Sequence, residues 1–395
     1  MEKNLTTGGV LKNVVSFSLP FLLSYFLQTL YGMADLFIIG QYEGVASTTA
    51  VSVGSQIMHM LTVMIVGLAM GTTVTIGRAV GAGDREKTAK GIGNTVTLFM
   101  GLSVVLTLLL FFLSGGIVSL VQTPEQAADG TIKYLKVCFL GIPFITAYNI
   151  IAAIYRGIGD SKSPMYFVTV ACAANIGLDY FFMGALKMGP VGAALGTTLS
   201  QGISVVISLI FILKKKTDLP IKRAHFRPDR EVMGEILRIG VPVTLQDGFI
   251  QVAFMVVTVI ANRRGLTDAA AVVQFFAEPI VSLFTSDAGV ITAGGQYYRG
   301  YVWDSCIGSI QFSFSGYFCA CGRSELSFLH NIISIITVRV PGAFLASRFF
   351  ADTLLPMGFA SSAGSLVSSV VCVAAFLIIT RNGRSPLKTP KEATV

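Results

Sequence analysis

The stretch PFLLSYFLQTLYGMADLFIIG, Pro20 to Gly40, is long and apolar enough to cross a bilayer as one helix, for which about 20 residues suffice. It nevertheless contains one acid, Asp35. Gln28, Tyr31 and Asp35 follow one another at spacings of three and four residues, so a helix places them on one face. Because a carboxylate in hydrocarbon costs at least about 2.5 kcal/mol, we expect this face to point into a bundle of helices. Asp35 is a functional candidate, and a helix-end contact with the next loop is the structural alternative.

The composition extends this prediction to the whole chain. Of its 395 residues, 53% are hydrophobic and 13% are charged, and the mean hydropathy is +0.71, whereas soluble domains carry about 25% charged residues. Apolar runs of spanning length recur throughout, which predicts an all-α polytopic membrane protein. The net charge of +8 reflects topology, because most Lys and Arg fall in segments predicted to be cytoplasmic. It does not indicate a nucleic-acid partner. The lead before the first span has no signal-peptide pattern.

Glycine-rich and basic segments divide the first half into six predicted helices. The loops GRAVGAGDREKTAKG and RGIGDSKSP follow the second and fourth helices and indicate cytoplasmic ends. A basic stretch with two prolines, KKKTDLPIKRAHFRPDR at 214–230, separates two halves. We expect the six helices at about 14–40, 46–75, 91–120, 131–156, 164–185 and 190–214. We expect an N-terminal lobe at 1–213, a cytoplasmic linker at 214–231, a C-terminal lobe at 232–383 and a cytoplasmic tail at 384–395.

The second half repeats the first. VLKNVVSFSLP (10–20) aligns with VMGEILRIGVP (232–242), and FFLSGGIVSL (111–120) aligns with FFAEPIVSL (275–283). Each half begins and ends in the cytoplasm, so the two are parallel repeats related by an axis along the membrane normal. In secondary transporters, such repeats place the substrate path at their interface.

The number of residues that separates aligned positions in the two halves changes once along the chain. Gly44 aligns with Gly265, but Phe111 aligns with Phe275, so the second half is shorter between these two points. The shortfall is about 57 residues, enough for two spanning helices and the turn between them. The second half therefore lacks one helical hairpin between Val273 and Gln274.

Losing a hairpin preserves the sidedness of everything downstream. We therefore expect about ten full spans, with 265–290 as a short segment at the outer surface. A sequence error would produce the same gap.

These features together resemble the multidrug and toxic compound extrusion (MATE) transporters, most closely their bacterial DinF-like branch. The resemblance rests on two six-helix repeats, the pattern P-x7-Q-x2-Y-x3-D-x4-G in the first helix, GAGDREK after the second, RGIGDSKSP after the fourth and VGAALGTTLSQ in the sixth. It covers the whole chain apart from the missing hairpin.

In that family a polar cluster in the N-terminal lobe binds the coupling cation. The resemblance implies that Asp35, Asn175, Asp179 and Thr197 form this cluster here. It also implies that Gln28, Tyr31, Tyr134 and Asn149 contact the substrate. The residue types agree, because carboxylate, amide and hydroxyl oxygens suit Na⁺, and two close acids alternatively share a proton. A purely structural polar network is the alternative. The repeat alignment pairs the four cation-site residues with Val257, Val338, Gly342 and Ala363, and so predicts the site in one lobe only.

Three further charged residues fall in predicted helices of the C-terminal lobe. Asp247 and Asp304 either line the drug cavity or pair with a buried base, for which Arg339 is the candidate.

The sequence thus predicts a secondary antiporter that exports amphipathic, cationic compounds in exchange for Na⁺ or H⁺ by alternating access. We expect a monomer in the bacterial cell membrane with both termini cytoplasmic, no cofactor and no enzymatic activity; the chain has no P-loop motif. One alternative is a lipid-linked oligosaccharide flippase of related fold, which would need a basic cavity. The other is a membrane protein that the missing hairpin has left unable to transport.

Overall fold

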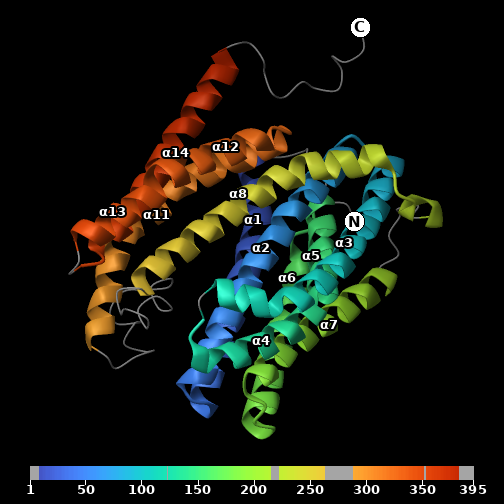
Figure 1. Cartoon of the computed structure of the whole chain (residues 1–395). Coiled ribbons are helices and arrows are strands. Elements are labelled where there is room, and N and C mark those ends of the chain that lie inside the picture. The colour runs from blue at the N-terminus through green and yellow to red at the C-terminus, as the bar shows by residue number, and fades with distance from the viewer. Residues whose placement is uncertain (1–8, 122, 215–221, 263–287, 351–352, 382–395) are drawn as a thin grey trace. The chain divides into compact units, whose positions relative to one another are not determined.

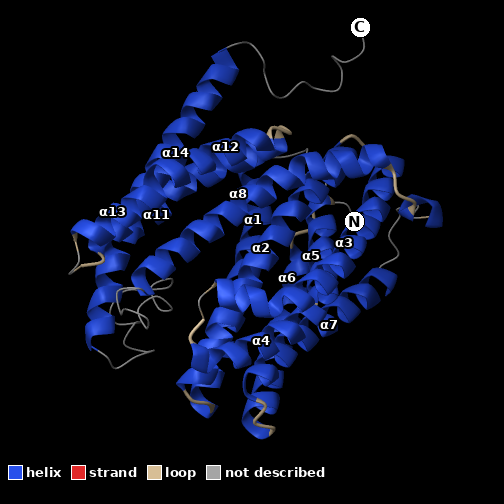
Figure 2. Cartoon of the chain, in the orientation of Figure 1, coloured by secondary structure: helices blue, strands red, loops and turns tan. Residues whose placement is uncertain are grey.

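The computed structural model consists of α-helices joined by short turns (Figure 2). It describes residues 9–121, 123–214, 222–262, 288–350 and 353–381, and these ranges contain no strand. The α-helices are labelled in Figure 1, and the described helical segments are α1 (Val10–Tyr42), α2 (Val45–Gly81), α3 (Arg85–Leu120), α4 (Glu125–Leu140), α5 (Ile142–Gly157), α6 (Lys162–Asp179), η1 (Tyr180–Ala185), α7 (Gly189–Lys214), η2 (Arg223–Phe226), α8 (Arg230–Asn262), α11 (Ala288–Ala320), α12 (Ser324–Ser334), η3 (Ile335–Arg339), α13 (Val340–Phe349) and α14 (Leu355–Arg381).

The described helices confirm an all-α membrane protein. Seven helical segments are long and apolar enough to span a bilayer, and the bent pair α4–α5 makes an eighth. Helices α8 and α11 have 33 residues each, or about 50 Å at 1.5 Å per residue, and therefore also have spanning length. The described part of the chain thus contains up to eight segments that are long and apolar enough to span a bilayer, and two more, α8 and α11, that have the length alone. The count of about ten spans stays a prediction.

Helices α2 and α3 are longer than the sequence predicts. The predicted loop at 77–91 is reduced to a turn of three residues, Ala82–Asp84, in which Gly83 has φ 72°. Asp84 caps α3 by accepting a hydrogen bond from the Lys87 backbone N–H at 2.8 Å. Because this cap starts the helix early, Lys87 and Lys90 lie on the first turns of α3 and not in a loop.

The predicted fourth helix is broken. Helices α4 and α5 meet at Gly141 with a bend of 51°. Pro143, in the first turn of α5, has no N–H to continue the hydrogen bonding of α4. Gly141 also allows α7 to approach closely, because any larger residue would place a Cβ atom 2.5 Å from the Thr198 Cγ2 atom.

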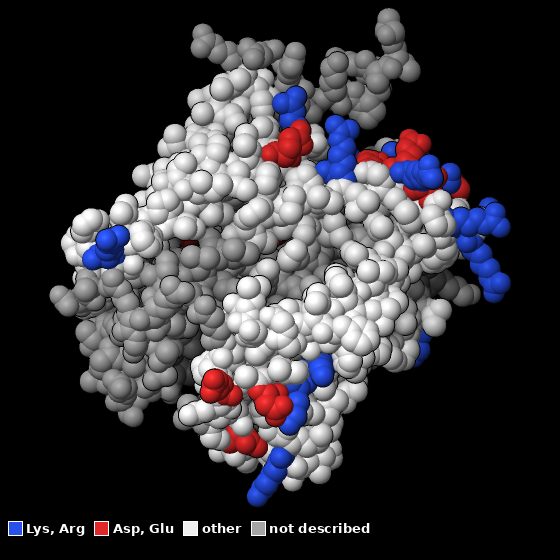
Figure 3. All heavy atoms as spheres, viewed as in Figure 1, with Lys and Arg blue, Asp and Glu red and all other residues white. Residues whose placement is uncertain are grey.

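The chain divides into two compact units, Met1–Gly240 and Val241–Val395. In unit 1, α2 packs against α4 and α5, and α6 packs against α1 and α7. In unit 2, α14 packs against α11, α12 and α13. Charged side chains gather at the ends of unit 1 and are scarce between them (Figure 3). Large apolar side chains such as Phe112 and Leu213, each 81% exposed, cover its helices, as a lipid-facing surface requires.

Several sequence predictions lie outside the described residues. They are the point of the missing hairpin between Val273 and Gln274, the outer segment from 265 to 287, and the tail at 384–395. The final residues of the predicted outer segment, 288–290, belong to α11.

Candidate functional site

Asp35 and Thr197 meet inside unit 1. The Thr197 hydroxyl, on α7, donates a hydrogen bond to the Asp35 Oδ2 atom, on α1, at 3.1 Å. Asp35 is 3% exposed although it lies in an apolar helix. The prediction that this acid points into the bundle is therefore confirmed.

Asp179 and Asn175 complete the cluster from α6. Both are fully buried and lie one helical turn apart. Both neighbour the Asp35 carboxyl group. Asp179 also packs against Gly196, where a Cβ atom would collide with the Asp179 Oδ1 atom. Immediately after Asp179 the helix widens into the π-helical segment η1, a distortion that is frequent at functional sites. The structure thus brings together all four residues predicted to bind the cation.

The cluster has unused hydrogen-bonding capacity. No partner within hydrogen-bonding distance exists among the described residues for Asp35 Oδ1, for either Asp179 oxygen, or for the Asn175 amide oxygen and nitrogen. Buried polar atoms are normally paired. Two carboxylates with an amide and a hydroxyl oxygen fit Na⁺, and two adjacent acids equally fit a shared proton. The described residues contain no group of three or more His, Cys, Asp or Glu side chains that could hold a metal ion, so a cation here would rely on the amide and hydroxyl oxygens as well as the two carboxylates.

The neighbouring residues Gln28 and Tyr31 lie half-buried on α1. The Tyr31 hydroxyl accepts a hydrogen bond from the Gln201 Nε2 atom at 3.4 Å. Gln201 lies on α7, one turn beyond Thr197, so one helix contacts both Asp35 and Tyr31. Gln201 is not among the site residues predicted from the sequence. Its spacing of four residues from Thr197, which places both on one helix face, could have indicated it.

Tyr134 and Asn149 have contacts that serve packing. Tyr134 is 2% exposed and belongs to an apolar cluster with Ile38 and Ile39. Its ring lies against Gly54, where a Cβ atom would collide with the Tyr134 Cδ1 atom. The Asn149 Nδ2 atom donates to the Ile145 carbonyl of its own helix at 2.8 Å. Their role in substrate binding remains a prediction.

In unit 2, Asp304 pairs with the buried base Arg339, which is one of the two alternatives predicted from the sequence. The Arg339 Nη2 atom lies 3.6 Å from Asp304 Oδ1. The Ser365 hydroxyl donates to the same oxygen at 2.5 Å, and Arg339 Nη2 donates to Ser365 Oγ at 2.6 Å. Asp247 is half-buried beside Gln246, which donates to Ser315 Oγ at 3.1 Å. Ser365 was not selected from the sequence, because the repeat alignment pairs Thr197 with Ala363.

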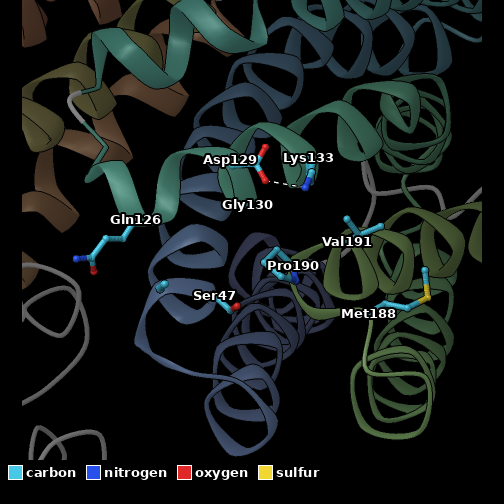
Figure 4. Close-up of a pocket in the computed structure, with 9 residues that line it drawn as sticks. Ser47, Gln126, Asp129, Gly130, Lys133, Met188, Pro190 and Val191 are labelled. Carbon is cyan, nitrogen blue, oxygen red and sulfur yellow. Dashed lines mark ion pairs between the residues drawn. The ribbon is translucent and has the colours of Figure 1, made fainter.

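A separate cavity of about 330 Å³ opens at one end of unit 1 (Figure 4). Its wall is formed by the start of α2, the start of α4 and the segment leading into α7. The Asp129–Lys133 ion pair, with an N–O distance of 2.6 Å, lies on it. None of the residues predicted to bind cation or substrate lines this cavity.

Comparisons with known proteins agree with this architecture. The probable multidrug resistance protein YpnP of Bacillus subtilis is 34% identical over 262 residues, which cover 66% of this chain and 58% of that protein. The probable multidrug resistance protein NorM of Thermotoga maritima is 25% identical over 413 aligned positions, 87% of each chain. A solved multidrug resistance MATE transporter in an outward-facing conformation has the same fold, with a TM-score of 0.82 at 22% identity over 96% of this chain and 97% of that one.

The family model MatE matches this chain twice, over residues 20–181 and 249–345. The second match is much shorter than the first, in keeping with a shorter second half. The two matches together span more than half of the chain. We conclude that the chain belongs to the MatE family.

Proposed function

We propose that this chain is a secondary antiporter that exports amphipathic, cationic compounds from a bacterial cell in exchange for Na⁺ or H⁺. The observation that carries the proposal is the buried cluster of Asp35, Asn175, Asp179 and Thr197, whose polar atoms have capacity for one more partner. The relatives named above, described as probable multidrug resistance proteins, support drug-like substrates.

The cation would act by neutralising the two carboxylates. With the site empty, Asp35 and Asp179 carry charge in a buried environment, a state that favours an arrangement admitting water or a cationic drug. With the cation bound, the charge is compensated, the Asp35–Thr197 contact holds α1 to α7, and the cation would link Asp179 of α6 to Asp35. Gln201 would pass this change to Tyr31 and Gln28 on the drug-binding side. Cation and drug thereby bias different states, which is the requirement for alternating access.

The protein would reside in the cell membrane as a monomer, with both termini in the cytoplasm. We keep the division into lobes at 1–213 and 232–383, joined by the linker at 214–231, as part of this proposal. The half that lacks a hairpin is the one without the proposed cation site.

Efflux of a fluorescent cationic dye from cells expressing the chain tests the proposal. We expect dye efflux that Asp35→Asn abolishes. Asp129→Asn serves as the matched control, because Asp129 is an exposed acid of the same unit whose side chain pairs with Lys133 at the surface. Membrane insertion of each variant is verified by immunoblot of the membrane fraction.

Two outcomes would contradict the proposal. Unchanged efflux by Asp35→Asn would refute the cation site. An inserted chain that exports no dye from any of several chemical classes would refute export and favour a protein that no longer transports.

A further inference from the structure

Both units bury an acid that a glycine–hydroxyl pair contacts in the same way, from α7 in unit 1 and from α14 in unit 2. In unit 1, Gly196 leaves room for Asp179, and the next residue, Thr197, donates to Asp35. In unit 2, Gly364 leaves room for Arg339, since a Cβ atom there would collide with the Arg339 Cγ atom. The next residue, Ser365, donates to Asp304. A glycine followed by a hydroxyl residue thus forms part of each cluster.

The two clusters differ in what compensates the acid. In unit 1 a second carboxylate, Asp179, lies beside the first, and three of the four carboxylate oxygens lack a hydrogen-bond partner among the described residues. In unit 2 the group that packs against the glycine is a guanidinium. Arg339 is 6% exposed, lies 3.6 Å from Asp304 Oδ1 and shares the Ser365 hydroxyl with it.

We infer that Arg339 is a tethered counter-ion that occupies the cation position of a second, closed site formed by Asp304 and Ser365. Placing a fixed positive charge beside Asp304 satisfies the acid permanently, so no mobile cation is taken up there. Removing Arg339 would leave a buried carboxylate without compensation, a state that a small cation from solution relieves. Arg339 thereby restricts ion binding to unit 1.

The repeat in the sequence explains only part of this similarity: it aligns the segments 189–196 and 355–364, which end at Gly196 and Gly364, but at its fixed offset of about 166 residues the hydroxyl residues do not coincide. Its alignment pairs Thr197 with Ala363, two residues before Ser365, and pairs Asp35 with Val257. Asp304 instead lies on α11, which aligns with the helix pair α4–α5. The acid of the second site therefore comes from a helix that the repeat does not pair with α1, and its contact with Ser365 is recognised only from the structure.

Na⁺ binding to purified full-length chain tests the inference in an Asp35→Asn background, which removes the site of the proposed function. We measure ²²Na⁺ binding, and Tm in NaCl against choline chloride at equal ionic strength. Asp35→Asn alone should show neither binding nor a Na⁺-specific shift. Adding Arg339→Met should restore ²²Na⁺ binding and give a Na⁺-specific rise in Tm of about 3 °C or more.

Two matched variants show whether the restored binding belongs to this site. Adding Asp304→Asn to Asp35→Asn/Arg339→Met should abolish the restored Na⁺ binding. This triple variant has no buried charge left at the second site, so it also controls for an effect of Arg339→Met on folding. Arg339→Lys should not restore it, because the ammonium still compensates Asp304. If Arg339→Met does not purify, Arg339→Gln replaces it and keeps a donor for Ser365.

Absence of Na⁺ binding in a folded Asp35→Asn/Arg339→Met or Arg339→Gln protein would overturn the inference. So would binding that survives Asp304→Asn. Failure of the proposed function would be seen in a different comparison, between the unaltered chain and Asp35→Asn alone. If Asp35→Asn binds ²²Na⁺ or exports dye as well as the unaltered chain does, the proposed function fails and the inference about Arg339 is judged separately.

Discussion

At the scale of single residues, two adjacent threonines on α7 offer a sharp comparison. Thr197 donates to Asp35 Oδ2, whereas the buried Thr198 hydroxyl has no hydrogen-bond partner among the described residues. Valine has the shape of threonine and removes only the hydroxyl. The pair therefore separates a hydroxyl that contacts Asp35 from a neighbouring buried hydroxyl that does not.

We predict that Thr197→Val weakens cation binding about tenfold, since a hydrogen bond to a charged group contributes about 1.5–3 kcal/mol. The measurement is the Na⁺ or H⁺ concentration that gives half-maximal dye efflux from proteoliposomes. Thr198→Val should leave this concentration unchanged. Equal effects of the two substitutions would mean that the Thr197 hydroxyl is not part of the cation site.

At the scale of helices, the segment just before α8 is docked onto α3. The Asn94 side chain donates to the His225 carbonyl at 3.2 Å and accepts from the Asp229 N–H at 2.7 Å. The buried His225 ring lies 3.0 Å from Glu86, and the Thr97 hydroxyl donates to the Phe226 carbonyl at 2.7 Å. The sequence predicted a linker here from charge and proline. It contained no sign of these partners on α3, which lies far away along the chain.

Gly93 makes this docking possible, so we predict that Gly93→Ala releases the segment. A Cβ atom at Gly93 would collide with the His225 carbonyl oxygen, and backbone cannot yield as a flexible side chain can. Overpacking of this kind costs about 1–3 kcal/mol, which should speed tryptic cleavage at the exposed Lys222 and Arg223 about tenfold.

The matched control for this experiment is Gly101→Ala on the same helix, where a Cβ atom meets nothing within 4 Å. Its cleavage rate should equal that of the unaltered chain. If Gly93→Ala is cleaved no faster than Gly101→Ala, the segment is not held by its contact with α3.

At the scale of the whole molecule, the sequence predicted the elements better than their irregularities. Hydropathy and charge predicted the spanning helices of the first half because a bilayer imposes both length and composition on a helix. The bend at Gly141 and the π-helical segments η1 and η3 escaped prediction. The bend did have a local signal, because Gly141 and Pro143 both disfavour a continuous helix. The π-helical segments have no comparable pattern in the sequence.

The sequence predicted those site residues that stand out within a single helix. It did not predict those that become recognisable only when several helices pack together. Asp35 stood out as an acid in an apolar run, and the family resemblance supplied its three partners. Gln201 and Ser365 are ordinary polar residues of apolar helices until the fold brings Tyr31 and Asp304 beside them. Their roles follow from tertiary contacts alone.

The direction of transport depends on how the chain lies in the membrane, and α3 gives a direct test. Its 36 residues extend about 54 Å, well beyond the bilayer core of about 30 Å, so its two ends lie on opposite faces. Arg78, Arg85 and Lys87 surround its first end, which the positive-inside rule assigns to the cytoplasm. The exposed residues Ala82 and Glu125 flank the two ends.

We predict that a membrane-impermeant maleimide labels Glu125→Cys in intact cells and Ala82→Cys only in inside-out vesicles. The chain without an added cysteine is the background control, and four of its own cysteines, Cys138, Cys172, Cys319 and Cys372, are buried. Labelling of both positions from one side would mean that α3 does not cross the membrane. The reverse labelling pattern would invert the molecule and turn the proposed exporter into an importer under the same cation gradient.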